Sequence, residues 1–153
     1  MKYCILSIFL LLSGAATETV RGKVVRVIDG DTVVLLVAGN KQERIRLADI
    51  DAPERGQDFS DKSRQLLSSL VAGKTVRVEY SGRDMYGRIL GTVYVGRKNV
   101  NEEMVRQGLA WEYRNNRNKR IKDLQAEAQR KRLNIFSLPI PINPYDYRNR
   151  NRK

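Results

Sequence analysis

The chain has 153 residues, which is enough for one domain with a substantial core but not comfortably for two. Its 29 lysines and arginines outnumber 17 acidic residues, so the formal net charge is +12 and a polyanionic partner is expected. With no histidine and a single cysteine, Cys4, the sequence excludes Ser-His-Asp and Cys-His nucleophiles, histidine-ligated zinc and internal disulfides.

The N-terminus has the layout of a secretory signal peptide. Lys2 precedes an apolar run over residues 3–12 and small residues at 13–16, which predicts a signal peptide at residues 1–15 cleaved after Ala15 or Ala16. A membrane anchor is the alternative, but the run is shorter than the roughly 18–20 apolar residues that a spanning helix needs. We therefore expect an exported protein, periplasmic or secreted into the medium, without stable membrane association after cleavage.

The residues from Val20 onward alternate as strands do. Segments rich in β-branched residues, bounded by turn signals at Asp29-Gly30 and residues 38–41, predict a three-stranded meander. Two further strands follow a predicted helix and are joined by a polar loop over residues 81–88. The five predicted strands are Val24–Ile28, Thr32–Val37, Gln42–Leu47, Thr75–Tyr80 and Ile89–Val95.

Apolar stripes and capping residues predict about three helices. The first lies between the third and fourth strands, with Ser60 or Asp58 as its N-cap and Gly73 at its end. The second is capped by Asn101 and closed by Gly108, and the third spans residues 119–132. This element order predicts an α+β fold, mainly β, formed by a five-stranded oligonucleotide-binding (OB-fold) barrel with flanking helices over residues 20–137. Residues 138–153 are predicted to form an extended, partly disordered basic tail.

Three short segments concentrate charged residues. They are Ile28–Thr32 (Ile-Asp-Gly-Asp-Thr), residues 44–54, which hold two arginines and three acids, and residues 83–88. Each has a structural explanation when taken alone: a hairpin turn, a strand edge whose charges neutralise one another, and a solvated loop.

Together the three segments predict a hydrolytic site. Asp31 and Asp51 can ligate a hard divalent cation, and the absence of histidine and cysteine favours calcium, magnesium or manganese over zinc. Glu54 can act as a general base toward water. Arg46 and Arg88 can clamp a phosphate and stabilise charge that develops on its oxygens. This set fits phosphodiester hydrolysis.

These motifs, together with residues 100–110 and 133–137, resemble the staphylococcal nuclease-like, or thermonuclease, family over about residues 22–137. The resemblance implies an oligonucleotide-binding barrel and calcium-dependent cleavage of DNA and RNA with little sequence preference, leaving 3′-phosphates. The residues that it implies for the site are Asp31 and Asp51 with the backbone carbonyl of Ala52 for the metal, Glu54 as base, Arg46 and Arg88 for the phosphate, Tyr86 for the terminal phosphate of a nucleotide, and Tyr113 for base stacking.

The sequence departs from the family pattern at two positions. Ala52 stands where the founding nuclease has threonine, and Met85 replaces a lysine that contacts phosphate. An alanine keeps the backbone carbonyl, whereas the lost lysine is expected to weaken nucleotide binding modestly. Arg46 and Asp51 are an odd number of residues apart, so their meeting is implied by the resemblance through a bend near the strand end. Arg88 is a poor proton donor because an arginine pKa exceeds 12, so its role is electrostatic.

Basic residues also gather outside the motifs. Residues 114–132 hold eight lysines and arginines. The tail adds Arg148, Arg150, Arg152 and Lys153, with Tyr145 and Tyr147 nearby, which suits phosphate contact and stacking on single strands. We expect a monomer with DNA and RNA as partners. The alternatives are a non-catalytic nucleic-acid-binding OB-fold module, which the retained arginines and Glu54 disfavour, and a cationic surface-binding protein, which leaves the clustered acids unexplained.

Overall fold

The computed structural model of the chain describes residues 16–152. The predicted signal peptide, with Cys4, lies outside the described residues. None of the helices within residues 16–152 combines the length and apolar character that a membrane crossing requires.

Strands form most of the core. Two predicted strands have the bounds that the sequence indicated, and the other three are longer. Strand β1 runs from Glu18 to Val27, β3 begins one residue early at Lys41, and β5 continues to Arg83. The strands are β1 (Glu18–Val27), β2 (Thr32–Val37), β3 (Lys41–Leu47), β4 (Ile50–Asp51), β5 (Thr75–Arg83), β6 (Ile89–Val95), β7 (Lys98–Asn99) and β8 (Trp111–Glu112).

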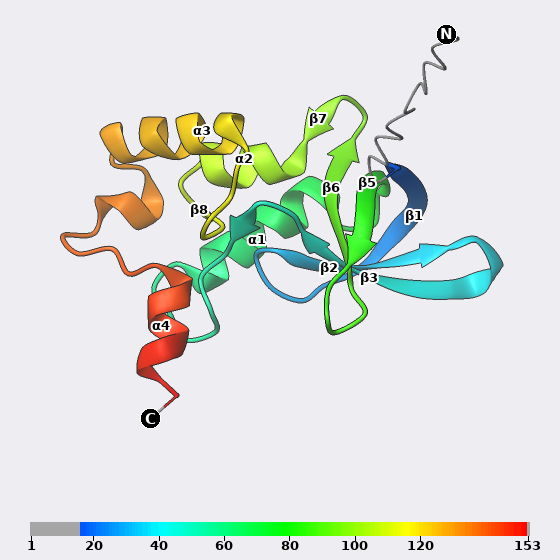
Figure 1. Cartoon of the computed structure of the whole chain (residues 1–153), viewed down its shortest axis with the longest axis horizontal. Helices are drawn as coiled ribbons and strands as arrows, with labels where there is room; N and C mark the ends of the chain where they lie inside the picture. The colour runs from blue at the N-terminus through cyan, green and yellow to red at the C-terminus, as the bar shows by residue number, and fades with distance from the viewer. Residues whose placement is uncertain (1–15, 153) are drawn as a thin grey trace, which may run out of the picture.

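Five of these strands close into a barrel with a parallel seam (Figure 1). Antiparallel pairing joins β3, β2, β1, β5 and β6 in that order, and β3 also pairs with β6 in parallel, with Ile45 opposite Ile89 and Leu47 opposite Gly91. A Cβ on Gly91 would lie 2.5 Å from Val78 Cγ1 on the neighbouring strand β5, so glycine is required at this position of β6. The predicted five-stranded OB-fold barrel is confirmed.

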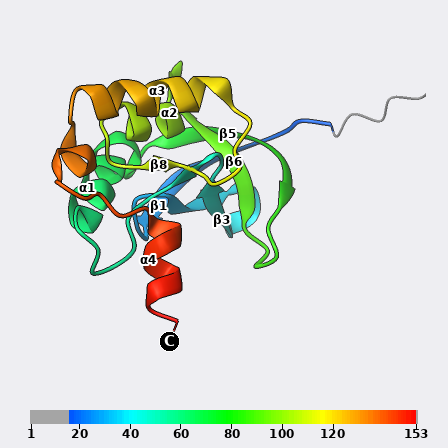
Figure 2. The ribbon, with the colours of Figure 1, turned by 60° about the vertical axis from the view of Figure 1, so that its left-hand side comes forward.

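Within residues 16–152, four α-helices and two short 3-10 turns accompany the barrel, where the sequence predicted about three helices. In Figures 1 and 2, α2 and α3 lie side by side at one end of the barrel, and α1 inserts Leu67 and Val71 into the same core as the strands. The helices are α1 (Ser60–Val71), α2 (Val100–Arg106), α3 (Lys119–Arg130) and α4 (Pro144–Arg150), and the 3-10 turns are η1 (Ala38–Asn40) and η2 (Asn134–Ser137).

The predicted N-cap of α2 is wrong by two residues. Asn99 is the cap, and its side chain accepts a hydrogen bond from the Glu102 amide. Asn101 instead lies inside the helix and is 2% exposed. Its Oδ1 accepts from the Val93 amide at 3.0 Å, and its Nδ2 donates to the Ala48 carbonyl at 2.9 Å. Asn101 therefore joins α2 to β6 and to the turn after β3.

The predicted caps of α1 are also wrong. Neither Ser60 nor Asp58 occupies the cap position, which belongs to Phe59 in the left-handed region at φ 66° without a side-chain cap bond. Phe59 packs against both hydrophobic clusters, so burial of its ring favours this backbone position over a polar cap. The helix ends at Val71, and Gly73 follows at φ 70°, in agreement with the predicted stop.

The C-terminal segment, residues 138–152, is not the extended tail that the sequence suggested. Residues 144–150 form α4, where the Asn143 side chain accepts from the Tyr145 amide at 2.9 Å and Pro144 occupies the first turn. Figures 1 and 2 place α4 outside the barrel, on the side of the loop between β4 and α1. This helix brings the end of the chain to the predicted site.

Candidate active site

Asp31 lies in the loop between β1 and β2. Gly30 of this loop has no side chain, so the loop packs closely against α1. The Asp29 carboxylate accepts from the Asp31 amide at 3.0 Å and shapes the loop. A Cβ on Gly30 would lie 2.8 Å from Ala52 Cβ and would overlap the Ser63 hydroxyl. The Asp-Gly-Asp motif is thus more than a hairpin turn, because Gly30 permits the close approach that brings Asp31 to Ala52.

A sharp turn between β3 and β4 places Asp51 beside Arg46. Strand β3 ends at Leu47, and Asp49 adopts φ 65° before β4 begins at Ile50. Strand β4 pairs with β8, where Asp51 lies opposite Trp111. The reversal removes the strand alternation that would separate Arg46 from Asp51, so the predicted bend is present.

Arg46 joins the two predicted metal carboxylates. Its Nη1 donates to the carbonyls of Leu47 at 2.7 Å and Ile50 at 2.9 Å, which fixes the guanidinium on the turn. Its Nη2 lies 3.1 Å from Asp51 Oδ1 and 3.2 Å from Asp31 Oδ2. The side chain is only 11% exposed, so this arrangement is formed before any ligand arrives.

The Asp31 carboxylate is buried, and burial makes its charged form unfavourable. Burial raises the pKa of Asp31 to about 6, against the attraction of Arg46, and the neighbouring Asp29 raises it further. The Ala52 amide donates to Asp31 Oδ2 at 2.8 Å, and the Thr32 hydroxyl donates to Oδ1 at 3.0 Å. An added cation would relieve the cost of keeping this carboxylate charged.

The donors suit a hard cation, although they are few. Within residues 16–152, no group of three or more His, Cys, Asp or Glu side chains gathers where it could hold a metal ion. Asp31 and Asp51 each place one oxygen within 3.2 Å of Arg46 Nη2, so the two carboxylates lie next to each other. Calcium, magnesium and manganese accept such oxygen donors and complete their shells with carbonyls and water. A divalent cation therefore fits these two carboxylates, with the backbone of Ala52 adjacent.

Glu54 lies at the edge of this cluster, on the loop that leads to α1. Its amide donates to Gln57 Oε1 at 2.9 Å, and the Gln57 amide donates back to the Glu54 carbonyl at 2.9 Å. The Glu54 side chain is 40% exposed, in contrast to the buried Asp51. A carboxylate that is half in water next to a buried charge cluster can accept a proton from solvent.

Arg148 of α4 is a member of the cluster that the sequence did not predict. Its Nη1 donates to Glu54 Oε1 at 2.6 Å and to Asp51 Oδ1 at 3.2 Å, and its Nη2 donates to Asp51 Oδ2 at 2.9 Å. The hydrogen bonds to Asp51 hold the pKa of Arg148 above its ordinary value. The capping signal Asn143-Pro144 could have indicated α4, but no local signal indicates where the helix docks.

Arg88 and Tyr86 lie on the loop between β5 and β6 and make no hydrogen bond or ion pair with the carboxylate cluster. Arg88 Nε donates to Asp84 Oδ2 at 2.7 Å, and its guanidinium lies 5.5 Å from the centre of the Tyr86 ring. The loop nevertheless reaches the site edge, because β6 begins at Ile89, opposite Ile45 on β3. Tyr86 is 75% exposed and faces solvent.

Tyr113 follows β8 and sits next to the turn that carries Asp51. Its amide donates to the Asp49 carbonyl at 2.7 Å, and its side chain is half exposed. Tyr113 therefore lies beside the turn that precedes Asp51, and its ring is available to a ligand.

Comparison with known proteins gives a consistent result. Residues 44–138 match the family model described as staphylococcal nuclease homologue. An uncharacterized endonuclease of Escherichia coli is 44% identical over 151 residues, which cover 97% of this chain and 98% of that protein. An uncharacterized endonuclease of Haemophilus influenzae is 42% identical over 94% of this chain and 82% of its own length. A micrococcal nuclease of Shigella flexneri is 39% identical over 93% of this chain and 88% of its own length.

Proposed function

The chain belongs to the staphylococcal nuclease family, and from this membership we propose that it is an exported, metal-dependent nuclease. It hydrolyses phosphodiester bonds of DNA and RNA with little sequence preference and leaves 3′-phosphate ends. The observation that carries the proposal is the convergence of Asp31, Asp51 and Arg46 beside the half-exposed Glu54. The net charge of +12 supports a polyanionic substrate.

Each side chain has a distinct task in the proposed reaction. Glu54 takes the proton of the attacking water, because its carboxylate reaches solvent while its loop is fixed by Gln57. Arg46 donates to a phosphate oxygen from a position that two backbone carbonyls already hold. Asp31 and Asp51 hold calcium, with magnesium or manganese as substitutes, and the bound metal supplies positive charge toward the phosphate.

The three remaining residues of the predicted site are assigned to the substrate. Arg88 moves from Asp84 to the phosphate and stabilises its developing charge. Tyr86 contacts a terminal phosphate and Tyr113 stacks on a base, since both rings are open to solvent. Met85, 89% exposed on the same loop, offers no phosphate contact, and affinity for nucleotide is correspondingly reduced.

A metal series tests this function. The purified chain is incubated with plasmid DNA and with RNA in calcium, magnesium, manganese or chelator, and the ends of the products are mapped. We expect cleavage with calcium, none with chelator, and 3′-phosphate products. Intact substrate under every metal, with retained binding, would instead favour the non-catalytic OB-fold module. Glu54→Gln is the matched control for contaminating nucleases.

A further inference from the structure

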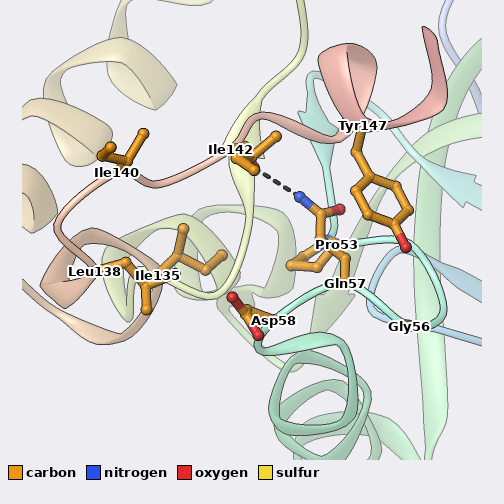
Figure 3. Close-up of a pocket in the computed structure, with 9 residues that line it drawn as sticks. All are labelled: Pro53, Gly56, Gln57, Asp58, Ile135, Leu138, Ile140, Ile142 and Tyr147. Atoms are coloured by element: carbon orange, nitrogen blue, oxygen red, sulfur yellow. Dashed lines mark hydrogen bonds between the residues drawn. The ribbon is translucent and has the colours of Figure 1, made fainter. Parts of the chain in front are cut away.

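The C-terminal segment is attached to the loop that carries Glu54. Gln57 Nε2 donates to the Ile142 carbonyl at 2.6 Å, as Figure 3 shows. In the same view the Tyr147 ring lies beside Gly56, where a Cβ would come within 3.5 Å of its hydroxyl. The family model ends at residue 138, so Ile142 and Tyr147 lie beyond the part of the chain that it matches. The Escherichia coli relative aligns with 97% of the chain, so its alignment continues past that residue.

Arg148 uses the oxygens that a cation needs. Both oxygens of Asp51 and one of Glu54 accept its hydrogen bonds, at 2.6–3.2 Å. Asp51 Oδ1 also accepts from Arg46, so the carboxylate is shared by two guanidinium groups. A calcium ion approaches a carboxylate oxygen to about 2.3–2.6 Å, and this approach is incompatible with a bidentate guanidinium on the same oxygens.

We propose that Arg148 is a built-in competitor of the divalent cation, occupying Asp51 and Glu54 until the metal displaces it. This inference rests on the proposed metal site. The metal must break the contacts of Arg148 with Asp51 before it can bind. The C-terminal segment therefore raises the metal concentration that is needed to fill the site. Occupation of Glu54 by the same guanidinium keeps the proposed base engaged until then.

The burial of the two arginines decides which of them is displaced. Arg46 is 11% exposed and is held by the carbonyls of Leu47 and Ile50 as well as by the carboxylates. Arg148 is 33% exposed, and within residues 16–152 its guanidinium donates hydrogen bonds only to Asp51 and Glu54. A guanidinium near the surface regains water when it is released, whereas Arg46 would leave two carbonyls unpaired. The metal therefore displaces Arg148 and leaves Arg46 in place.

The test compares calcium affinity in the full chain and three variants. Arg148→Ala and Arg148→Gln remove the guanidinium, and Gln keeps a polar side chain of similar length in case Ala disturbs α4. Arg150→Ala is the control, because it removes an exposed positive charge from the same helix. Isothermal titration calorimetry with calcium chloride gives the dissociation constant, and circular dichroism verifies that each variant is folded.

We expect both Arg148 variants to lower the calcium dissociation constant about tenfold, which corresponds to about 1.4 kcal/mol. The calcium concentration for half-maximal cleavage should fall by the same factor, and Arg150→Ala should change neither quantity more than about twofold because its charge is exposed and screened. Such parallel shifts would support direct competition.

Two results would overturn the proposal, and the wild-type titration separates them. If the wild type binds calcium and cuts DNA but the Arg148 variants bind calcium with unchanged or weaker affinity, Arg148 is not a competitor and the proposed function stands. If neither the wild type nor the variants bind any divalent cation, the metal site itself is wrong and the inference fails with it.

Discussion

The two sides of the site are built differently. On the barrel side, Asp31, Arg46 and Asp51 come from β3, β4 and the loop after β1, and their charged side chains are 4–11% exposed. On the loop side, Arg88 is 24% exposed and pairs with Asp84 four residues earlier on the same loop. Deeply buried charges cannot be rearranged cheaply, whereas a partly exposed loop ion pair exchanges partners at lower cost. The barrel side is therefore formed in advance, whereas in the proposed reaction the loop side changes partners when substrate binds.

This difference predicts which substitutions separate activity from stability. Changes on the barrel side should affect both properties, because the same contacts hold the fold and the site. Changes on the loop side, or at the exposed Glu54, should affect activity alone.

The largest effect is expected for Glu54→Gln. The amide keeps the size of the side chain but cannot accept the proton of water, so turnover should fall by about 10²–10⁴-fold. Initial rates of DNA cleavage at saturating calcium measure this loss, and nucleic-acid affinity should remain within about twofold because few of its contacts change. Turnover within a few-fold of wild type would remove Glu54 from the role of base.

Arg46→Ala should damage both the fold and the reaction. Removing the guanidinium leaves the buried Asp31 without its partner and the carbonyls of Leu47 and Ile50 without donors. We expect a loss of about 3–5 kcal/mol in the free energy of unfolding, measured by urea denaturation. A loss below about 1 kcal/mol would contradict the description of the barrel side as preassembled.

Arg88→Ala should reduce activity with little change in stability. Its contact with Asp84 is partly exposed, so the free energy of unfolding should fall by no more than about 1 kcal/mol. Turnover should fall by about 10²–10³-fold, since a donor to the phosphate is lost. The contrast with Arg46→Ala in the same urea experiment is the direct test of the two-sided architecture. Normal turnover would show that Arg88 stays on Asp84 throughout the reaction.

The smallest effect is expected for Glu43→Gln, which alters the contact between the β5–β6 loop and β3. Arg83 Nη1 donates to Glu43 Oε2 at 2.8 Å and to the Gly87 carbonyl at 2.9 Å, which ties the loop to β3. The hydrogen bond from Arg83 lowers the pKa of Glu43 below its ordinary value. The stabilisation is therefore complete above the unfolded-state pKa of Glu43 and is lost as the pH falls through its lower folded-state pKa.

Glu43→Gln should consequently cost about 0.5–1 kcal/mol at pH 7, a modest value because Arg83 is largely exposed. The difference from wild type should shrink as the pH falls below the ordinary pKa of glutamate, which is 4.5. Urea denaturation across this range measures it. A difference that is constant with pH would show that the carboxylate charge does not anchor the loop.

The sequence predicted the barrel well because its signals are local. Thr32–Val37 and Ile89–Val95 are runs of apolar and β-branched residues between turn signals, and both strands have the predicted bounds. The capping error at Asn101 has a long-range cause, since its bonds to Val93 and Ala48 depend on packing between distant elements. Two asparagines, Asn99 and Asn101, lie near the start of this helix, and the local sequence does not indicate which of them is the N-cap.

The site residues also differ in whether local sequence could predict them. Asp31, Arg46, Asp51 and Glu54 came from motifs whose spacing is short, and the turn at Asp49 supplies the geometry that spacing alone could not give. Arg148 lies 97 residues from Asp51 in the chain, so its place among the carboxylates depends on the complete fold. The sequence indicated only a basic tail.

The position of α4 affects how the protein should be prepared for study. A polyhistidine tag fused to the C-terminus would begin a few residues after Arg148 and would bring imidazoles to a chain that has none, beside the carboxylates under test. Imidazoles titrate near neutral pH, so such a tag would add pH-dependent positive charge beside Asp51 and Glu54 and would change their affinity for the titrated cations. The exposed turn at Ala38–Asn40 joins β2 and β3, and in Figure 1 it lies at the other end of the molecule from α4. An affinity tag inserted there would stay away from the carboxylates.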